Sequence, residues 1–196
     1  GALSGADSVV DQRSASVSVS LAYRPICRVC VRTSTVCVKT LVPGVSRSDQ
    51  RRFAASLLDS MLGGSASSRL FQEIREQRGM AYSVYTYGSQ YADTGQVGVY
   101  VGTREDNLGE CVRIIADQLA LMGDGRFDPA ELARAKENLK GRIMLSMEST
   151  SNRASRLGKS VLTDTEILSL DRICAEIDAV EPEAISALAR QLFAPD

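Results

Sequence analysis

Two residues that could do chemistry stand seven positions apart, where a predicted helix gives way to a predicted strand. Arg75 lies near the end of the helix, and Tyr82 opens the strand. A guanidinium group can hold a carbonyl or carboxylate oxygen, and a phenol hydroxyl can donate a hydrogen bond to a developing negative charge. Simpler roles exist: Arg75 can complement the helix dipole, and Tyr82 can pack in a sheet as we expect of Tyr85, Tyr87 and Tyr91. On the residues alone, these structural roles are favoured.

Histidine is absent from the 196 residues, which excludes a Ser-His-Asp or Cys-His nucleophile and a His-ligated metal built from this chain alone. The five cysteines are an odd number in dissimilar contexts, which favours a reducing compartment over a disulfide framework. Cys27 and Cys30 form a C-x-x-C pattern, but in a β-rich stretch such positions point to opposite faces. We interpret them as small apolar strand residues, with a zinc or redox role as the alternative.

Composition and charge narrow the function classes. An apolar content of 44% is enough to bury a core. The net charge is -1 and the basic residues are interspersed with acids, so no nucleic-acid partner is expected. No run of about 18 apolar residues is present, so we expect no transmembrane helix and no membrane partner. Residue 1 is Gly and no signal-peptide pattern follows, so we expect part of a longer, cytoplasmic protein.

Residues 57–87 are the stretch that would position Arg75 and Tyr82, and they predict helix, glycine break, second helix and strand. Gly63 and Gly64 would end the first helix, where a residue without Cβ can take the left-handed conformation. Ser65 and the serines after it offer N-cap oxygens for the second helix. This turn could also touch a substrate, although helix termination explains it fully.

The remaining chain adds strands and a series of helices. Strands are predicted at residues 34–42, 80–91 and 96–103, and helices at residues 48–62, 105–122, 128–148, 149–162, 165–177 and 181–193. Asp128 and Pro129 are the clearest helix start, an N-cap followed by proline at the first helical position. The order predicts an α+β fold, an antiparallel sheet with helices packed on one face. Residues 1–33 are assigned to a linker or poorly defined N-terminal segment, and residues 34–196 to one lobe.

The strand at residues 96–103 predicts a sheet buried on one side. Its valines would face the helices, while Gly98, Tyr100 and Gly102 would face outward. Such an outward face suits a cavity wall, or a surface that another domain or a second copy of the chain covers. An ordinary solvated face with close backbone packing fits equally well.

Several short sequence motifs that occur in a fixed order indicate the fold and function more specifically than the composition does. They are Leu62-Gly63-Gly64, Ser67-Ser68-Arg69-Leu70-Phe71, Glu73-Ile74-Arg75-Glu76, Arg78-Gly79-Met80-Ala81-Tyr82-Ser83-Val84, Asp93-x-Gly95, Val101-Gly102-Thr103 and Glu148-Ser149-x6-Arg156-Leu157-Gly158. Together they resemble the second, C-terminal lobe of the pitrilysin/insulinase-type zinc metallopeptidases, close to the bacterial processing-peptidase branch. The resemblance covers roughly residues 42–193.

In that family, two homologous lobes close around an unfolded peptide. The first lobe carries an inverted zinc motif, H-x-x-E-H, with a distal Glu ligand, and the second contributes an Arg and a Tyr to the same active site. The family's Arg-x6-Tyr pair falls on Arg75 and Tyr82 here, which the resemblance implies to be catalytic. It further implies zinc bound by the other lobe and none by this chain. The implied partners are an N-terminal zinc-binding lobe and a peptide substrate. Separately from the resemblance, the outward face of residues 96–103 makes a homodimer an alternative assembly.

Two functions follow from different classes. In the first, the chain is the substrate-binding lobe of a zinc metalloendopeptidase and is inactive alone, with Gly63, Gly64 and Ser65 as further substrate-binding candidates. In the second, it is a structural or scaffold subunit of the same fold that lost hydrolysis. The retained Arg75 and Tyr82 favour the first, and an H-x-x-E-H motif encoded upstream in the parent gene would discriminate between the two.

Overall fold

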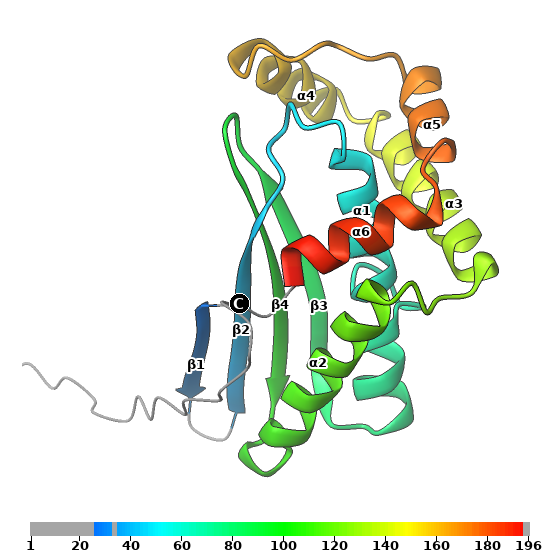
Figure 1. Cartoon of the computed structure of the whole chain (residues 1–196). Helices are drawn as coiled ribbons and strands as arrows, with labels where there is room; N and C mark the ends of the chain where they lie inside the picture. The colour runs from blue at the N-terminus through cyan, green and yellow to red at the C-terminus, as the bar shows by residue number, and fades with distance from the viewer. Residues whose placement is uncertain (1–25, 33–34, 194–196) are drawn as a thin grey trace, which may run out of the picture.

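The computed structural model describes residues 26–32 and 35–193, which form one antiparallel sheet and a set of helices gathered on one of its faces (Figure 1). The strands are β1 (Ile26–Arg32), β2 (Thr35–Gly44), β3 (Ala81–Gln90) and β4 (Gly95–Thr103), in the spatial order β1-β2-β4-β3. The helices are α1 (Arg52–Leu62), η1 (Phe71–Gln77), η2 (Glu105–Asn107), α2 (Leu108–Gly123), α3 (Pro129–Ser146), α4 (Thr150–Leu162), α5 (Leu170–Asp178) and α6 (Pro182–Phe193). This arrangement confirms the predicted α+β class.

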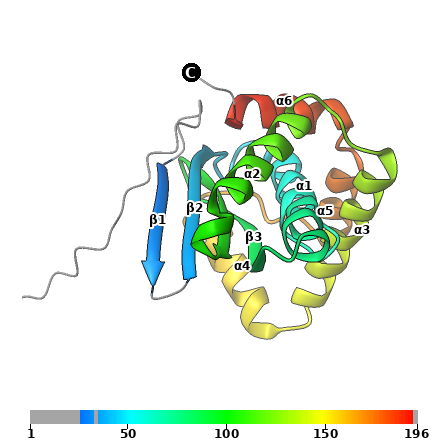
Figure 2. The same cartoon turned by 90° about the horizontal axis from the view of Figure 1, so that it is seen from below.

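The core lies between the sheet and the helices, which Figure 2 shows on the same side when the molecule is seen from below. On β4, Val97, Val99 and Val101 are buried, as the alternation predicts. They belong to one apolar cluster with the buried leucines of α1 and with Ile114, Ile115, Ile185 and Leu188 from α2 and α6. Burying each such side chain contributes about 1.5–3 kcal/mol, so this layer is what holds β3 and β4 in place.

On the outward face of β4, tyrosines of β3 lie against Gly98 and Tyr100. Gly98 pairs with Tyr87 in the β3–β4 register, and a Cβ on Gly98 would lie 2.5 Å from Cζ of that tyrosine. Tyr85 stacks on Tyr100 with ring centroids 4.8 Å apart. The glycine therefore makes room for an aromatic ring of the same sheet.

The sheet also reaches further toward the N-terminus than residue 34. β1 pairs with β2 in an antiparallel register that runs from Ile26 opposite Leu41 to Arg32 opposite Thr35. Cys27 and Cys30 lie on β1, as the strand assignment predicts, while their side chains are outside the described part. Residues 1–25 also lie outside the described part of the chain. The division into residues 1–33 and 34–196 therefore stays a prediction. Along the described residues, no helix is both long and apolar enough to span a membrane.

The prediction that Gly63 or Gly64 adopts a left-handed conformation is wrong. Gly63 caps α1 with φ -155° and ψ 1°, outside the left-handed region, and the described glycines with positive φ are Gly79 and Gly125. The reason for glycine at position 63 is space: a Cβ there would lie 2.5 Å from the backbone N of Thr86 on β3. No side chain of the described residues caps the second helix either, and the Oγ of Ser68 instead donates a 2.6 Å hydrogen bond to the carbonyl of Ser65.

Candidate functional site

The side chains of Arg75 and Tyr82 meet at the junction between η1 and β3. The guanidinium carbon Cζ of Arg75 lies 5.3 Å from the ring centroid of Tyr82 and 4.7 Å from that of Phe71. The cation is thus held between two aromatic rings, each contributing about 0.5–1 kcal/mol at an exposed site. Phe71 was not singled out from the sequence, although its i, i+4 spacing to Arg75 on a helix was a readable signal.

The backbone at this junction explains why the two side chains come together. The expected second helix is a π-helix over Phe71–Gln77, in which each turn holds an extra residue. Gly79, just beyond its end, has φ +60°, and the N–H of Met80 donates to the carbonyl of Ile74 at 2.9 Å. A bulge then interrupts the β3–β4 register between Ala81 and Ser83. The residue between them, Tyr82, is left out of the pairing and turned outward, as bulges commonly do to a side chain.

Both functional groups are accessible. Tyr82 is 84% exposed, and the Arg75 side chain is 40% exposed with Glu76 as its ion-pair partner at 3.6 Å. An exposed ion pair of this length contributes at most about 1 kcal/mol, so an incoming carbonyl or carboxylate can compete for the guanidinium. The arrangement places a cation against the ring of an exposed tyrosine, so a guanidinium and a phenol hydroxyl, two groups that can interact with an oxyanion, are both available on one surface.

The turn at Gly63, Gly64 and Ser65 has structural partners. Gly63 is buried against Thr86, and Arg142 of α3 donates a 3.0 Å hydrogen bond from Nη1 to the carbonyl of Gly64. Within the described ranges, no hydrogen bond, ion pair or ring contact joins this turn to Arg75 or Tyr82. The structure therefore gives the turn a packing role and leaves substrate contact as a prediction.

The described residues of this chain offer no zinc site. The sequence has no histidine, and no group of three or more Cys, Asp or Glu side chains that could hold a metal ion occurs in the described part. Cys111, a free cysteine, is buried, and burial raises the pKa of its thiol, which disfavours the thiolate that metals bind.

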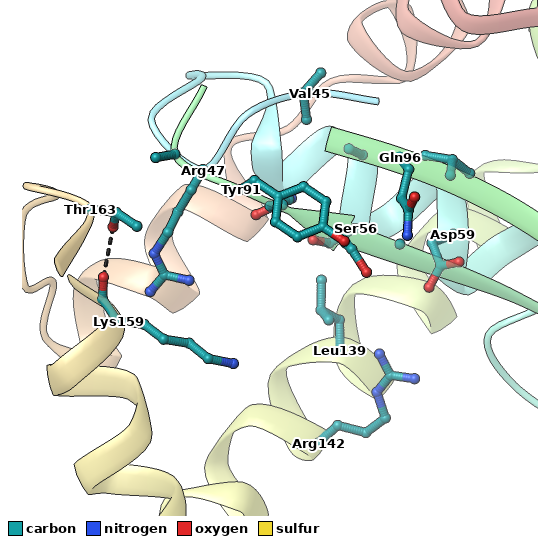
Figure 3. Close-up of a pocket in the computed structure, with 16 residues that line it drawn as sticks. Val45, Arg47, Ser56, Asp59, Tyr91, Gln96, Leu139, Arg142, Lys159 and Thr163 are labelled. Carbon is teal, nitrogen blue, oxygen red and sulfur yellow. Dashed lines mark hydrogen bonds between the residues drawn. The ribbon is translucent and has the colours of Figure 1, made fainter. Parts of the chain in front are cut away.

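A cavity of about 630 Å³ opens near the other end of β3, where the β3–β4 hairpin meets α1, α3 and α4 (Figure 3). It is lined by Arg47, Arg142 and Lys159 and by one acid, Asp59. Burial raises the pKa of Asp59, and the charge of Arg142 partly opposes that rise. The sequence analysis missed all four residues, because they come from three helices and a connecting loop and share no spacing pattern.

Asp59 makes the stability of the chain depend on pH. Because its pKa is raised above the ordinary value of 3.8, the folded chain keeps this proton at pH values where the unfolded chain has lost it, and folding stability falls as pH rises through that window. Asp59→Asn should therefore raise the melting temperature at pH 7 and change it little near pH 4. Thermal melts of both proteins at the two pH values test this. The exposed Asp117→Asn is the control, and an equal Asp59→Asn effect at both values would contradict the prediction.

Comparisons with known proteins agree on the family. The model of the peptidase M16 inactive domain matches residues 29–139. An uncharacterized zinc protease of Streptomyces coelicolor is 42% identical over 152 residues, 78% of this chain and 33% of the relative. The uncharacterized zinc protease YmxG of Bacillus subtilis is 42% identical over 153 residues, 78% of this chain and 37% of the relative. The chain thus spans about a third of the length of these relatives.

Solved structures support the fold. A peptidase M16 inactive domain from Pseudomonas fluorescens superposes with a TM-score of 0.73 at 23% identity, covering 85% of this chain and 40% of that one. A protease from Helicobacter pylori has a TM-score of 0.74 at 18% identity, with coverage of 83% and 40%. At these identities the likeness concerns the arrangement of the helices and the sheet.

Proposed function

The chain belongs to the family of peptidase M16 inactive domains, and from this premise we propose that it is the substrate-binding C-terminal lobe of a two-lobe zinc metalloendopeptidase. The substrates would be peptides or unfolded protein segments. The observation that carries the proposal is the contact between Arg75 and Tyr82, two accessible side chains held together at a bulge.

The two side chains take different parts in this proposal. The Arg75 guanidinium, fixed between two rings, holds a carbonyl or carboxylate oxygen of the bound peptide. The Tyr82 hydroxyl donates a hydrogen bond to the oxyanion that forms when water adds to the scissile carbonyl. The hydroxyl interacts more strongly with that oxyanion than with the neutral carbonyl, so it accelerates the reaction instead of merely tightening substrate binding.

The rest of the active site would come from outside this chain. Zinc, in this proposal, is bound by an N-terminal lobe of the parent protein, because the described residues of this chain do not fit the metal. That lobe is the proposed partner, and the tyrosine-lined outer face of the sheet is where it or a second copy would lie. The odd cysteine count favours a reducing compartment, and we place the protein in the cytoplasm.

A scaffold function remains the second candidate. The absence of metal ligands in the described part of the chain agrees with both candidates. The two differ in the parent protein, where only the peptidase requires a zinc site next to Arg75 and Tyr82.

Metal content and peptide hydrolysis test the proposal together. The purified 196-residue chain should contain no stoichiometric zinc and cleave no unfolded peptide, while the parent protein should bind one zinc per copy and cleave the peptide. Removing zinc from the parent with a chelator and adding it back should abolish and then restore cleavage. Stoichiometric zinc in the isolated chain, or a zinc-free parent without cleavage, would contradict the proposal.

A further inference from the structure

The cavity in Figure 3 gathers positive charge from three separate segments. Arg47 comes from the connection between β2 and α1, Arg142 from α3 and Lys159 from α4, and their side chains extend toward the same space. Its floor is apolar, with Ala55 and Leu139 among the lining residues. A concave site with an apolar floor and a few convergent polar groups is the usual form of a small-molecule site.

These three cations have no acidic partner of their own. In the part of the chain that the structure describes, none of them forms an ion pair, whereas Arg69 pairs with Glu131 at 2.7 Å and Arg113 with Asp117 at 3.0 Å. Asp59 is the acid in the lining and lies on the Arg142 side of the cavity, where its charge interacts with that cation. The side that holds Arg47 and Lys159 therefore carries uncompensated positive charge.

One guanidinium nitrogen of Arg47 lacks a hydrogen-bond acceptor in the described part of the chain. Its Nη2 donates to Oγ of Ser160 at 3.3 Å, but its Nε is buried and has no partner among the described residues. A buried donor on a charged group that is left unpaired carries the full cost of its removal from water. A carboxylate or phosphate oxygen is the acceptor that the planar guanidinium matches best.

A second, smaller cavity of about 150 Å³ shares Arg47 with the first. Its lining adds Arg52 and Arg156, with Glu166 as the acid among the lining residues. Arg47 thus stands between two hollows that each present further cations, and the positive potential extends across it. Such a distribution favours a ligand with several negative charges over a single chloride or acetate.

We propose that the cavity between α1, α3, α4 and the β3–β4 hairpin binds a small multivalent oxyanion, a compound with two or more phosphate or carboxylate groups. One group would be held by Arg47 and Lys159, and the remainder would lie over the apolar floor toward Arg142. The site lies at the opposite end of β3 from Tyr82, so it is separate from the proposed peptidase site. Because the ligand joins the β2–α1 connection to α4, binding stabilises the fold.

Calorimetric titration of the 196-residue chain tests this directly. Tripolyphosphate and citrate are titrated separately at one fixed ionic strength, which distinguishes phosphate from carboxylate recognition. We expect saturable binding of one equivalent of at least one of them, together with a rise in melting temperature. Arg47→Gln combined with Lys159→Gln should weaken binding at least tenfold. Peptidase activity does not enter the measurement, so a failure here leaves the proposed function untouched.

A matched control variant removes two positive charges from residues that do not line the cavity. Arg113→Gln with Arg126→Gln takes two positive charges from exposed positions away from the cavity and should leave the affinity within twofold. Lys159→Gln alone, at an exposed position on α4, keeps the test valid if the double variant unfolds, and it too should weaken binding. Absence of saturable binding to both anions, or equal weakening by the control pair, would overturn the proposal.

Discussion

Tyr82→Phe in the complete two-lobe protein should lower kcat by roughly 10²–10³, the usual cost of removing one hydrogen-bond donor to an oxyanion. The substitution removes a hydroxyl from a side chain that is 84% exposed, so it leaves no buried cavity. The phenyl ring can still lie against Arg75, because that contact is made by the ring face. We therefore expect zinc content and melting temperature to stay at wild-type values. Steady-state kinetics on an unfolded peptide provide the measurement.

Arg75→Lys is the contrasting variant. It keeps the charge and loses the planar guanidinium that stacks between Phe71 and Tyr82. If Arg75 holds the substrate in the ground state, the change should raise KM more than it lowers kcat. Tyr85→Phe, on the same strand and also exposed, is the matched control and should retain activity. Wild-type kcat in the Tyr82→Phe protein would refute the catalytic assignment and return Tyr82 to the role of a strand aromatic.

Local chemistry accounts for the parts of the fold that could be predicted from sequence. Asp128 does cap α3, accepting a 2.8 Å hydrogen bond from the N–H of Ala130, with Pro129 at the start of the helix. Ser149 caps α4 in the same way, with its side chain accepting from Asn152. In these cases the acceptor, the proline or the apolar stripe lies within a few residues of the feature that it determines.

The features that could not be predicted depend on residues far apart in the sequence. The apolar positions Leu70, Phe71 and Ile74 fit an α-helix and a π-helix equally, so the wider turn that carries Arg75 leaves no sequence signal. Whether Gly98 is exposed to solvent or covered depends on the register between β4 and β3, which places Tyr87 against it. The four charged residues of the cavity likewise become neighbours only through the packing of α3 and α4 around the hairpin.

Gly63 also depends on a residue far away in the sequence, because it packs against Thr86 of β3. Gly63→Ala should lower the free energy of unfolding by about 3 kcal/mol, the upper part of the range for overpacking. The added Cβ would lie 2.5 Å from the backbone N of Thr86, an atom of β3 that cannot rotate away as a side chain could. At about 2–4 °C per kcal/mol for a chain of this size, the melting temperature should fall by roughly 6–12 °C.

The backbone conformation makes this variant a clean test of packing against substrate contact. Gly63 has a negative φ of -155°, so the substitution removes no left-handed conformation, and the clash of the new Cβ with β3 is the expected source of the lost stability. Gly141→Ala is the control, since a Cβ within α3 would meet no atom within 4 Å, and it should stabilise the chain by about 0.5–1 kcal/mol. If Gly63 instead serves only to contact the peptide, Gly63→Ala would leave the melting temperature unchanged and raise KM in the two-lobe protein. That outcome would restore Gly63 to the substrate site and show that β3 can move away from the end of α1.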